Sequence, residues 1–234
     1  MKSEEFAAAM MMRRILPICF FLFLLASISS CEKDSYEKGE GRYSLLQADF
    51  ANLTVDNEKR GVSFVTDEGE SYLLSNPMKA SWIQTADTVY RTYLYYNKVD
   101  NGRAKVSSMG ILPTLKPRDA KDFKRLPQDP LGLESSWLTR DGKFINMGLL
   151  LKNGRDDNGK EGTHALSVAL DEVRQNEDQT KTAYYRLLHE QGEAPEYYTN
   201  RRYVCILLPT KQRPDSVCLT VNTYDGVVVK RFKL

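Results

Sequence analysis

Histidine is scarce in this sequence. Only His164 and His189 occur among 234 residues. A Ser–His–Asp or Cys–His arrangement places a histidine beside a nucleophile, and no recognisable motif surrounds either residue. We interpret both as partly exposed residues of β-strands. The sequence therefore predicts no catalytic residues and a protein that is not an enzyme.

Motifs for metals and cofactors are missing as well. Cys205 and Cys218 are not spaced as a CxxC pair, and no histidine cluster completes a tetrahedral zinc site. Residues 153–162 (NGRDDNGKEG) offer the oxygen ligands that calcium prefers, but Arg155 and Lys160 oppose a cation. We interpret this segment as a hairpin loop. A glycine-rich phosphate loop is also absent from the sequence, so we expect neither a metal nor a cofactor.

The sequence has no excess of either charge sign. Its 33 lysines and arginines nearly balance its 31 aspartates and glutamates, which gives a formal net charge of +2. Nucleic-acid binding requires clustered cations. The balanced composition therefore argues against a nucleic-acid partner.

A long apolar run is present near the N-terminus. Residues 15–28 (ILPICFFLFLLASI) follow the basic pair Arg13-Arg14. A basic region, an apolar region and small residues before a cleavage site are typical of a secretory signal. The run is shorter than the roughly 20 apolar residues that span a bilayer. We therefore predict that residues 1–30 are a signal peptide and are removed.

The cleavage site resembles the lipobox of bacterial lipoproteins. Ile28, Ser29 and Ser30 precede Cys31 as an aliphatic residue and two small residues. The resemblance implies cleavage between Ser30 and Cys31 and lipid attachment to the Cys31 thiol. The alternative is an ordinary secretory signal followed by an incidental cysteine. Lipidation at Cys31 predicts a membrane-anchored protein of the cell envelope, in the outer membrane, at its periplasmic face or at the cell surface.

The remaining cysteines fall in neighbouring apolar runs. Cys205 lies in residues 203–208 and Cys218 in residues 216–221. If these runs form a symmetric hairpin, the two cysteines face each other within the Cα separation of roughly 4.4–6.8 Å that a disulfide needs. Export permits oxidation. The alternative is two buried free thiols that pack as small apolar residues.

The chain after the signal reads as an all-β protein of two domains. Residues 31–42 are polar and predict a flexible tether. Short segments rich in β-branched and aromatic residues then alternate with turn signals. In residues 43–117 five such segments predict an OB-like β-barrel, and Asn101-Gly102 is a strong hairpin signal. The five segments are 43–55, 61–66, 71–74, 88–98 and 103–112.

The second half predicts an antiparallel β-sandwich. Residues 118–132 are rich in proline and charge, which resists helix and sheet, so we interpret them as a linker. Residues 133–234 contain about seven strand-like segments, the number expected of a sandwich. Asp225-Gly226 joins the last two as a tight hairpin. These segments are 134–139, 143–152, 163–173, 182–190, 203–208, 216–223 and 227–233.

Aromatic residues give the best indication of a binding surface. The sequence has 13 tyrosines, four of which lie in residues 90–96. Strand side chains alternate between faces, so Tyr93 and Tyr95 share one face, while Tyr90 and Tyr96 share the other. One pair is expected in the core, and we predict that Tyr93 and Tyr95 form an aromatic binding surface. The alternative is that these rings only pack against neighbouring strands.

The order of these parts resembles the NigD-like lipoproteins of the Bacteroidota. The resemblance is carried by residues 69–73 (GESYL), 90–96, 101–102, 110–113 (GILP) and 222–226 (NTYDG). It implies an N-terminal OB-like domain, a C-terminal β-sandwich and no catalytic motif. The association of the family name with a bacteriocin locus implies an immunity-type role. We expect a non-enzymatic envelope lipoprotein with a protein or glycan partner, or else a bacteriocin-immunity or envelope-assembly accessory protein.

Overall fold

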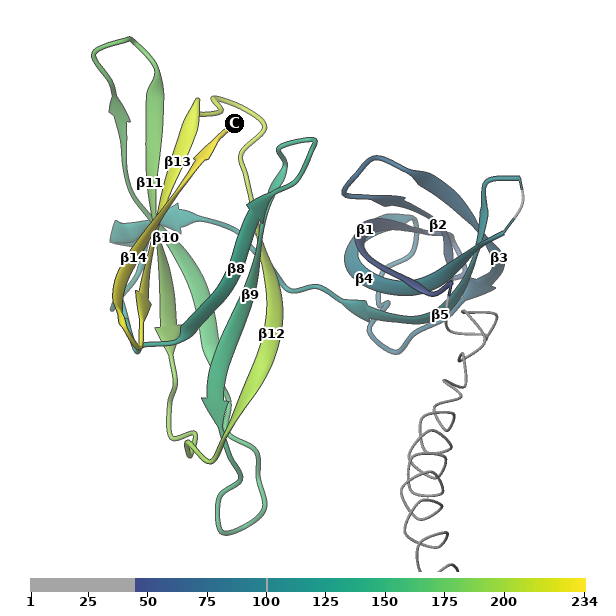
Figure 1. The fold of residues 1–234 in the computed structure, drawn as a ribbon, viewed down its shortest axis with the longest axis horizontal. Coiled ribbons are helices and arrows are strands. Elements are labelled where there is room, and N and C mark those ends of the chain that lie inside the picture. The colour runs from purple at the N-terminus through teal and green to yellow at the C-terminus, as the bar shows by residue number, and fades with distance from the viewer. Residues whose placement is uncertain (1–44, 100) are drawn as a thin grey trace, which may run out of the picture. The chain divides into compact units, whose positions relative to one another are not determined.

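The computed structural model describes residues 45–99 and 101–234, and every long element in it is a β-strand (Figure 1). This confirms the all-β class expected from the sequence. The predicted signal peptide, the tether of residues 31–42, Ser30 and Cys31 lie outside the described residues. Within residues 45–99 and 101–234, no helix is long and apolar enough to cross a membrane.

Five strands close into a barrel, as the sequence predicted. Their spatial order is β1-β2-β3-β5-β4, with β3 parallel to β5 and the other pairs antiparallel. Alternation along each strand directs one set of side chains inward, so Leu53 of β1, Phe64 of β2 and Leu94 of β4 are fully buried together. The strands are β1 (Gln47–Val55), β2 (Gly61–Thr66), β3 (Ser71–Met78), β4 (Thr88–Val99) and β5 (Arg103–Ile111).

The turn between β4 and β5 follows from its sequence. Asn101 and Gly102, in the connection between Val99 and its cross-strand partner Arg103, have φ values of 63° and 67°, which is the left-handed conformation. Asparagine and glycine adopt it at least cost. The predicted hairpin is therefore confirmed.

The remaining strands form two sheets that pack face to face. The four-stranded sheet has the order β6-β12-β9-β8, and the five-stranded sheet has the order β14-β13-β11-β10-β7. Strand bounds are β6 (Thr114–Leu115), β7 (Arg118–Asp119), β8 (Gly132–Leu138), β9 (Phe144–Asn153), β10 (Ala165–Gln175), β11 (Lys181–Glu190), β12 (Tyr198–Leu207), β13 (Ser216–Thr223) and β14 (Gly226–Lys233).

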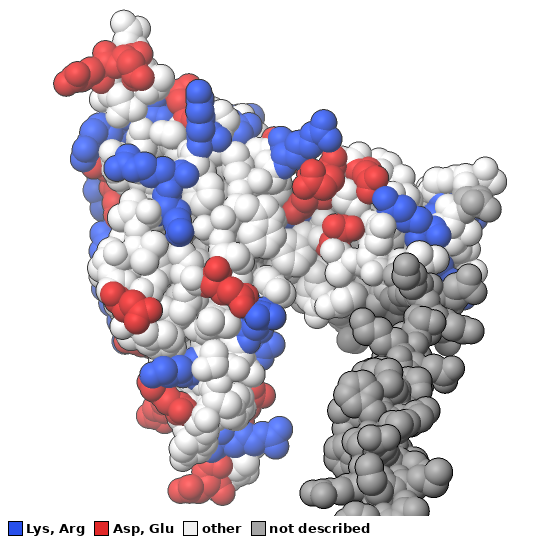
Figure 2. Space-filling view, in the orientation of Figure 1, with Lys and Arg blue, Asp and Glu red and all other residues white. Residues whose placement is uncertain are grey.

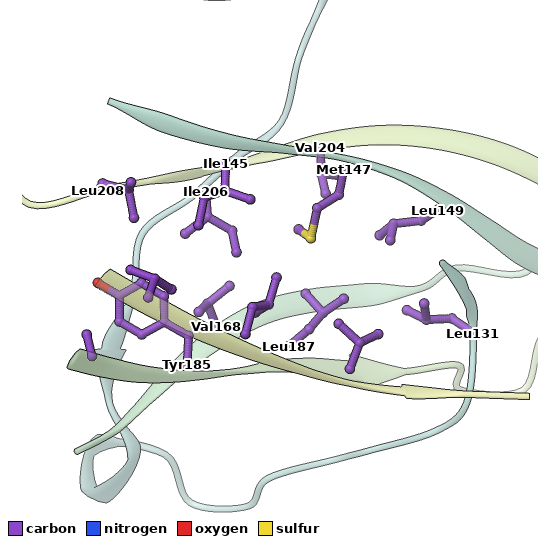
Figure 3. Close-up of a cluster of buried hydrophobic side chains, with 14 of the residues drawn as sticks. Leu131, Ile145, Met147, Leu149, Val168, Tyr185, Leu187, Val204, Ile206 and Leu208 are labelled. Atoms are coloured by element: carbon purple, nitrogen blue, oxygen red, sulfur yellow. The ribbon is translucent and has the colours of Figure 1, made fainter. Parts of the chain in front are cut away.

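The sandwich core lies between these sheets. Figure 3 shows Met147 and Leu149 from one sheet opposite Val168 and Leu187 from the other. All four side chains are almost fully buried. Replacing a buried leucine or methionine with alanine typically lowers the free energy of unfolding by about 2–5 kcal/mol. The core therefore fixes the register of β9 and β12, which also form a wall of the candidate site.

The exit from the barrel differs from the predicted linker. Residues 118–132 were expected to be unpaired, and residues up to 117 were expected to belong to the barrel. Instead β6 pairs in parallel with β12, and β7 pairs in parallel with β10. The prolines of this segment leave short extended stretches between them, and such stretches can pair at a sheet edge, where proline is tolerated. Residues 114–119 therefore belong to the sandwich.

The predicted hairpin between the two cysteine-containing strands is wrong. Cys205 lies on β12, which pairs with β9, and Cys218 lies on β13, which pairs with β11 and β14. The segment between β12 and β13 crosses from one sheet to the other, so the cysteines do not face each other. Both are buried free thiols. Burial raises the pKa of the Cys205 thiol, which keeps it protonated and unreactive.

Candidate binding groove

A groove of about 1380 Å³ lies within Leu46–Leu234, which form one compact unit. Residues of β1, β4 and β5 line it from the barrel. Residues of β9, β12 and the segment before β10 line it from the sandwich. Ligand sites commonly occupy roughly 300–1,000 Å³, so this groove can accept a ligand larger than a small metabolite.

Tyr93 and Tyr95 both line the groove. They project from the outer face of β4 and are 38% and 43% exposed. Tyr90 and Tyr96 point the opposite way and pack in the barrel core. Tyr96 also donates a hydrogen bond to Asp49. The alternation of the strand thus brings the two predicted residues to the groove, while their role in binding stays a prediction.

Gly110 makes room for the ring of Tyr93. The two residues are cross-strand partners on β5 and β4. A Cβ atom at position 110 would lie only 2.2 Å from the ring carbon Cζ of Tyr93, far inside van der Waals contact. The ring therefore lies over the glycine backbone, and any larger residue at position 110 has to displace it.

Three more aromatic rings form a cluster that we call the aromatic cluster: Phe50, Trp137 and Tyr203. The ring of Phe50 on β1 stacks on Trp137 of β8 at a centroid distance of 5.5 Å. It also meets Tyr203 of β12 edge-on at 5.2 Å. Trp137 and Tyr203 remain 38% and 37% exposed. Offset and edge-to-face pairs each contribute about 0.5–1.5 kcal/mol beyond burial, so the cluster holds rigid aromatic surface in the groove.

A buried polar network joins the barrel to β9. The guanidinium of Arg91 donates two hydrogen bonds to the carboxylate of Asp67, at 2.5 and 2.6 Å. Asn146 donates to Asp67 at 2.7 Å and accepts from Arg91 at 3.0 Å. The guanidinium also lies over the ring of Phe144, 4.5 Å from its centroid. The Arg91 side chain is 4% exposed and that of Asp67 is 14% exposed, so this network resists water and fixes the wall of the groove.

Charged side chains line one end of the groove. Glu161 accepts hydrogen bonds from the amide groups of Asn153 and Asn200. Arg201 pairs with Glu134, whereas the exposed side chain of Arg202 has no ion pair or hydrogen bond with any described residue. Figure 2 shows basic and acidic side chains interspersed over the visible face. A charged ligand would therefore be attracted by individual side chains and not by a large patch of one sign.

His164 is partly exposed, as predicted for both histidines, whereas His189 is not. His189 is only 1% exposed and shares a hydrogen bond with the carbonyl of Asp129 through Nδ1. Its Nε2 lies 2.9 Å from Nδ1 of His164, which lines the groove. Burial, followed by the charges of His189 and Arg202, lowers the pKa of His164. In the described part of the chain, the side chains of serine, threonine and cysteine make no hydrogen bond to either ring.

The glycine-rich segment of residues 153–162 forms a hairpin turn. Asp156 accepts backbone hydrogen bonds from Asn158 and Lys160, which is the usual side-chain support of a turn. Among residues 45–99 and 101–234, no group of three or more His, Cys, Asp or Glu side chains is arranged to hold a metal ion.

Sequence reasoning missed most of the groove. It identified Tyr93 and Tyr95 because their alternation is local. Phe50 and Tyr203 are far apart along the chain, and nothing in their local sequence indicates that their rings meet. The GILP segment contained Gly110, but only the structure shows which ring the glycine admits.

Comparison with known proteins shows the fold. No model of a protein family matches the sequence, and no curated protein matches it. Among solved structures, a NigD-like immunity protein from Bacteroides caccae is 19% identical, with a TM-score of 0.58 over 80% of this chain and 96% of that chain. A candidate toxin-related protein from Parabacteroides distasonis is 13% identical, with a TM-score of 0.60 over 81% and 93%. A candidate lipoprotein from Bacteroides fragilis is 11% identical, with a TM-score of 0.53 over 80% and 96%.

Proposed function

From its NigD-like fold, we propose that this chain is a lipid-anchored protein of the bacterial cell envelope that binds a partner without catalysing a reaction. The observation that carries the proposal is the groove, which six partly exposed aromatic rings line. Three come from the aromatic cluster, two are Tyr93 and Tyr95, and the sixth is Trp82. Such rings supply flat, amphipathic contact surface at low entropic cost.

The partner is a protein or a glycan, since both bind to exposed aromatic surface. Arginine and carboxylate groups at one end of the groove add hydrogen-bonding capacity for either class. A site with rigid aromatic anchors depends on a few central side chains for most of its affinity. Replacing Tyr95 with alanine should therefore weaken binding more than replacing an equally exposed residue outside the groove.

The groove is tested with purified protein on glycan arrays and on peptide libraries. Tyr95→Ala is compared with Val173→Ala, because Val173 is 53% exposed on β10 and lies outside the groove. Loss of a ligand with Tyr95→Ala but not with Val173→Ala supports the proposal. Equal binding by both variants places the ligand elsewhere and contradicts it.

The anchor is proposed from Ile28, Ser29, Ser30 and Cys31 in the sequence, and the candidate lipoprotein with the same fold supports it. Membrane sedimentation of wild type and Cys31→Ala tests it: the variant should become soluble, and continued sedimentation would contradict lipidation. We further propose outer-membrane placement. Protease treatment of intact cells then distinguishes two locations. A protein at the cell surface is digested, and a protein at the periplasmic face is protected.

A second function is favoured by the name of one solved structure with this fold, a NigD-like immunity protein. On this reading the partner is a bacteriocin. A deletion strain should then become sensitive to a toxin of its own species, and the wild-type gene should restore resistance. A strain that keeps full resistance to the whole toxin panel would exclude this role and leave the binding proposal in place.

A further inference from the structure

We propose that the ligand of the groove is an extended polypeptide segment that docks as an added strand on the open edge of β12. This inference rests on the proposed function and names the class of partner. Its evidence comes from the backbone of β12, from the side chains on either side of that edge, and from the exposed charge of Arg202.

The edge of β12 is only partly covered by another strand. On one side β12 pairs with β9 along its whole length, from Tyr198 to Leu207. On the other side lies β6, whose two residues pair with Cys205 and Ile206 alone. None of the described strands therefore borders the part of β12 before Cys205 on that side of the sheet.

The direction of the free backbone groups follows from one hydrogen bond. Cys205 donates its backbone N–H to the carbonyl of Pro113, toward the β6 side, at 2.9 Å. Backbone groups of a strand alternate in direction, so Tyr203 and Arg201 direct their N–H and C=O groups to this same side. Within the described residues these groups have no hydrogen-bond partner. A row of unpaired backbone groups is a template for another strand, and only a polypeptide matches its spacing.

The side chains on the two faces of this edge fit such a strand. On one face of β12, Val204 packs in the sandwich core, and on the other, Tyr203 contacts Phe50 of the barrel. An added strand would share these two faces. Toward the core it would meet Leu115 and Leu166, and toward the barrel it would meet groove residues such as Ile111. A ligand with alternating apolar side chains can therefore bury one set on each face.

Arg202 specifies the charge of the ligand. Its side chain is exposed, lines the groove and forms no ion pair with a described residue, whereas neighbouring Arg201 is paired with Glu134. A carboxylate beside the Arg202 guanidinium would complete a charge-assisted hydrogen bond. The structure thus favours an extended apolar segment that carries an acidic residue.

The β14 edge of the five-stranded sheet lacks these features. β14 is the last strand of the five-stranded sheet, and its exposed side chains include Arg231 and Lys233. Charged side chains on an edge strand commonly keep other strands from adding to it. No residue of β14 lines the groove.

The test is a random octapeptide library displayed on phage and selected against the full chain in detergent. Selection is repeated on Arg201→Pro and on Arg201→Ala. Proline removes the N–H that faces the open edge but breaks no bond to β9, whereas alanine removes only the side chain. We expect selected peptides to alternate apolar residues, to contain an acidic residue, and to bind Arg201→Ala at least about tenfold more tightly than Arg201→Pro.

A second measurement needs no change in the protein. Synthetic copies of a selected peptide are methylated on one backbone nitrogen at a time, and their affinities are measured by fluorescence anisotropy. An added strand donates hydrogen bonds from alternate residues only, so methylation should reduce affinity at every second position. This scan decides the question even if Arg201→Pro fails to fold.

Two outcomes would overturn the inference. Uniform tolerance of backbone methylation would show that side chains alone hold the peptide. A strand ligand would also be excluded if no peptide is selected more strongly by the wild type than by Arg201→Pro. If a glycan then binds and its binding requires Tyr95, the proposed function stays intact. If Tyr95→Ala changes the binding of neither peptides nor glycans, the proposed function fails as well.

Discussion

The network of Asp67, Arg91 and Asn146 allows the sharpest prediction about stability. Replacing Asp67 with alanine leaves the guanidinium of Arg91, which is only 4% exposed, without its carboxylate partner. Removing one partner of a buried ion pair typically costs about 3–5 kcal/mol, because the remaining charge is desolvated and uncompensated. For a domain of this size each kcal/mol lowers the melting temperature by about 2–4 °C, so Asp67→Ala should melt about 6–20 °C below wild type.

The assay is thermal unfolding of the full chain followed by circular dichroism. Glu70→Ala is the matched control, since it breaks the ion pair of Glu70 with Lys98, in which both side chains are well exposed. Exposed pairs contribute little to stability, so this variant should melt close to wild type. Arg91→Met in the Asp67→Ala background removes the stranded charge and should recover part of the loss. Asp67→Ala melting no lower than Glu70→Ala would refute the reasoning.

Three further predictions concern the groove and the core. Gly110→Ala should lower the free energy of unfolding, measured with denaturant, by about 1–3 kcal/mol through overpacking. Adding Tyr93→Ala to this variant should restore most of that loss. If the double variant is no more stable than Gly110→Ala, the contact of the ring with the glycine is contradicted. Cys205 and Cys218 should react with a maleimide once the protein is denatured, with no reductant added, and not in the native protein. Peptide mass spectrometry measures this labelling, and a disulfide-linked peptide would contradict the fold. Burial lowers the pKa of His164 below its ordinary 6.5, so at acid pH the unfolded chain binds a proton at this residue more readily than the folded chain. The free energy of unfolding should therefore fall from pH 7 to pH 5. It should fall less steeply for His164→Gln, and parallel curves of unfolding free energy against pH would show that His164 is not responsible.

Local chemistry explains what the sequence predicted correctly. The turn of Asn101 and Gly102 depends only on which residues tolerate positive φ. The outward position of Tyr93 and Tyr95 depends only on strand alternation. Both could be inferred from a few neighbouring residues.

Long-range pairing explains what the sequence left out or predicted wrongly. The apolar run around Cys205 is followed closely by the run around Cys218, and a hairpin is the simplest local solution. The structure instead pairs β12 with β9, since each sheet of the sandwich takes strands from distant parts of the chain. The contact of Phe50 with Tyr203 arises in the same way, because it depends on how β1 and β12 meet and not on either strand alone.

The most direct test of the central claim is site-specific crosslinking in living cells. A photoreactive benzoyl-phenylalanine replaces Tyr95, which lines the groove, or Val173, which is exposed outside it. A groove that binds a partner predicts a discrete light-dependent adduct from position 95 and none from position 173. The same adducts from both positions, or none from position 95, would contradict the claim that this groove is the binding site.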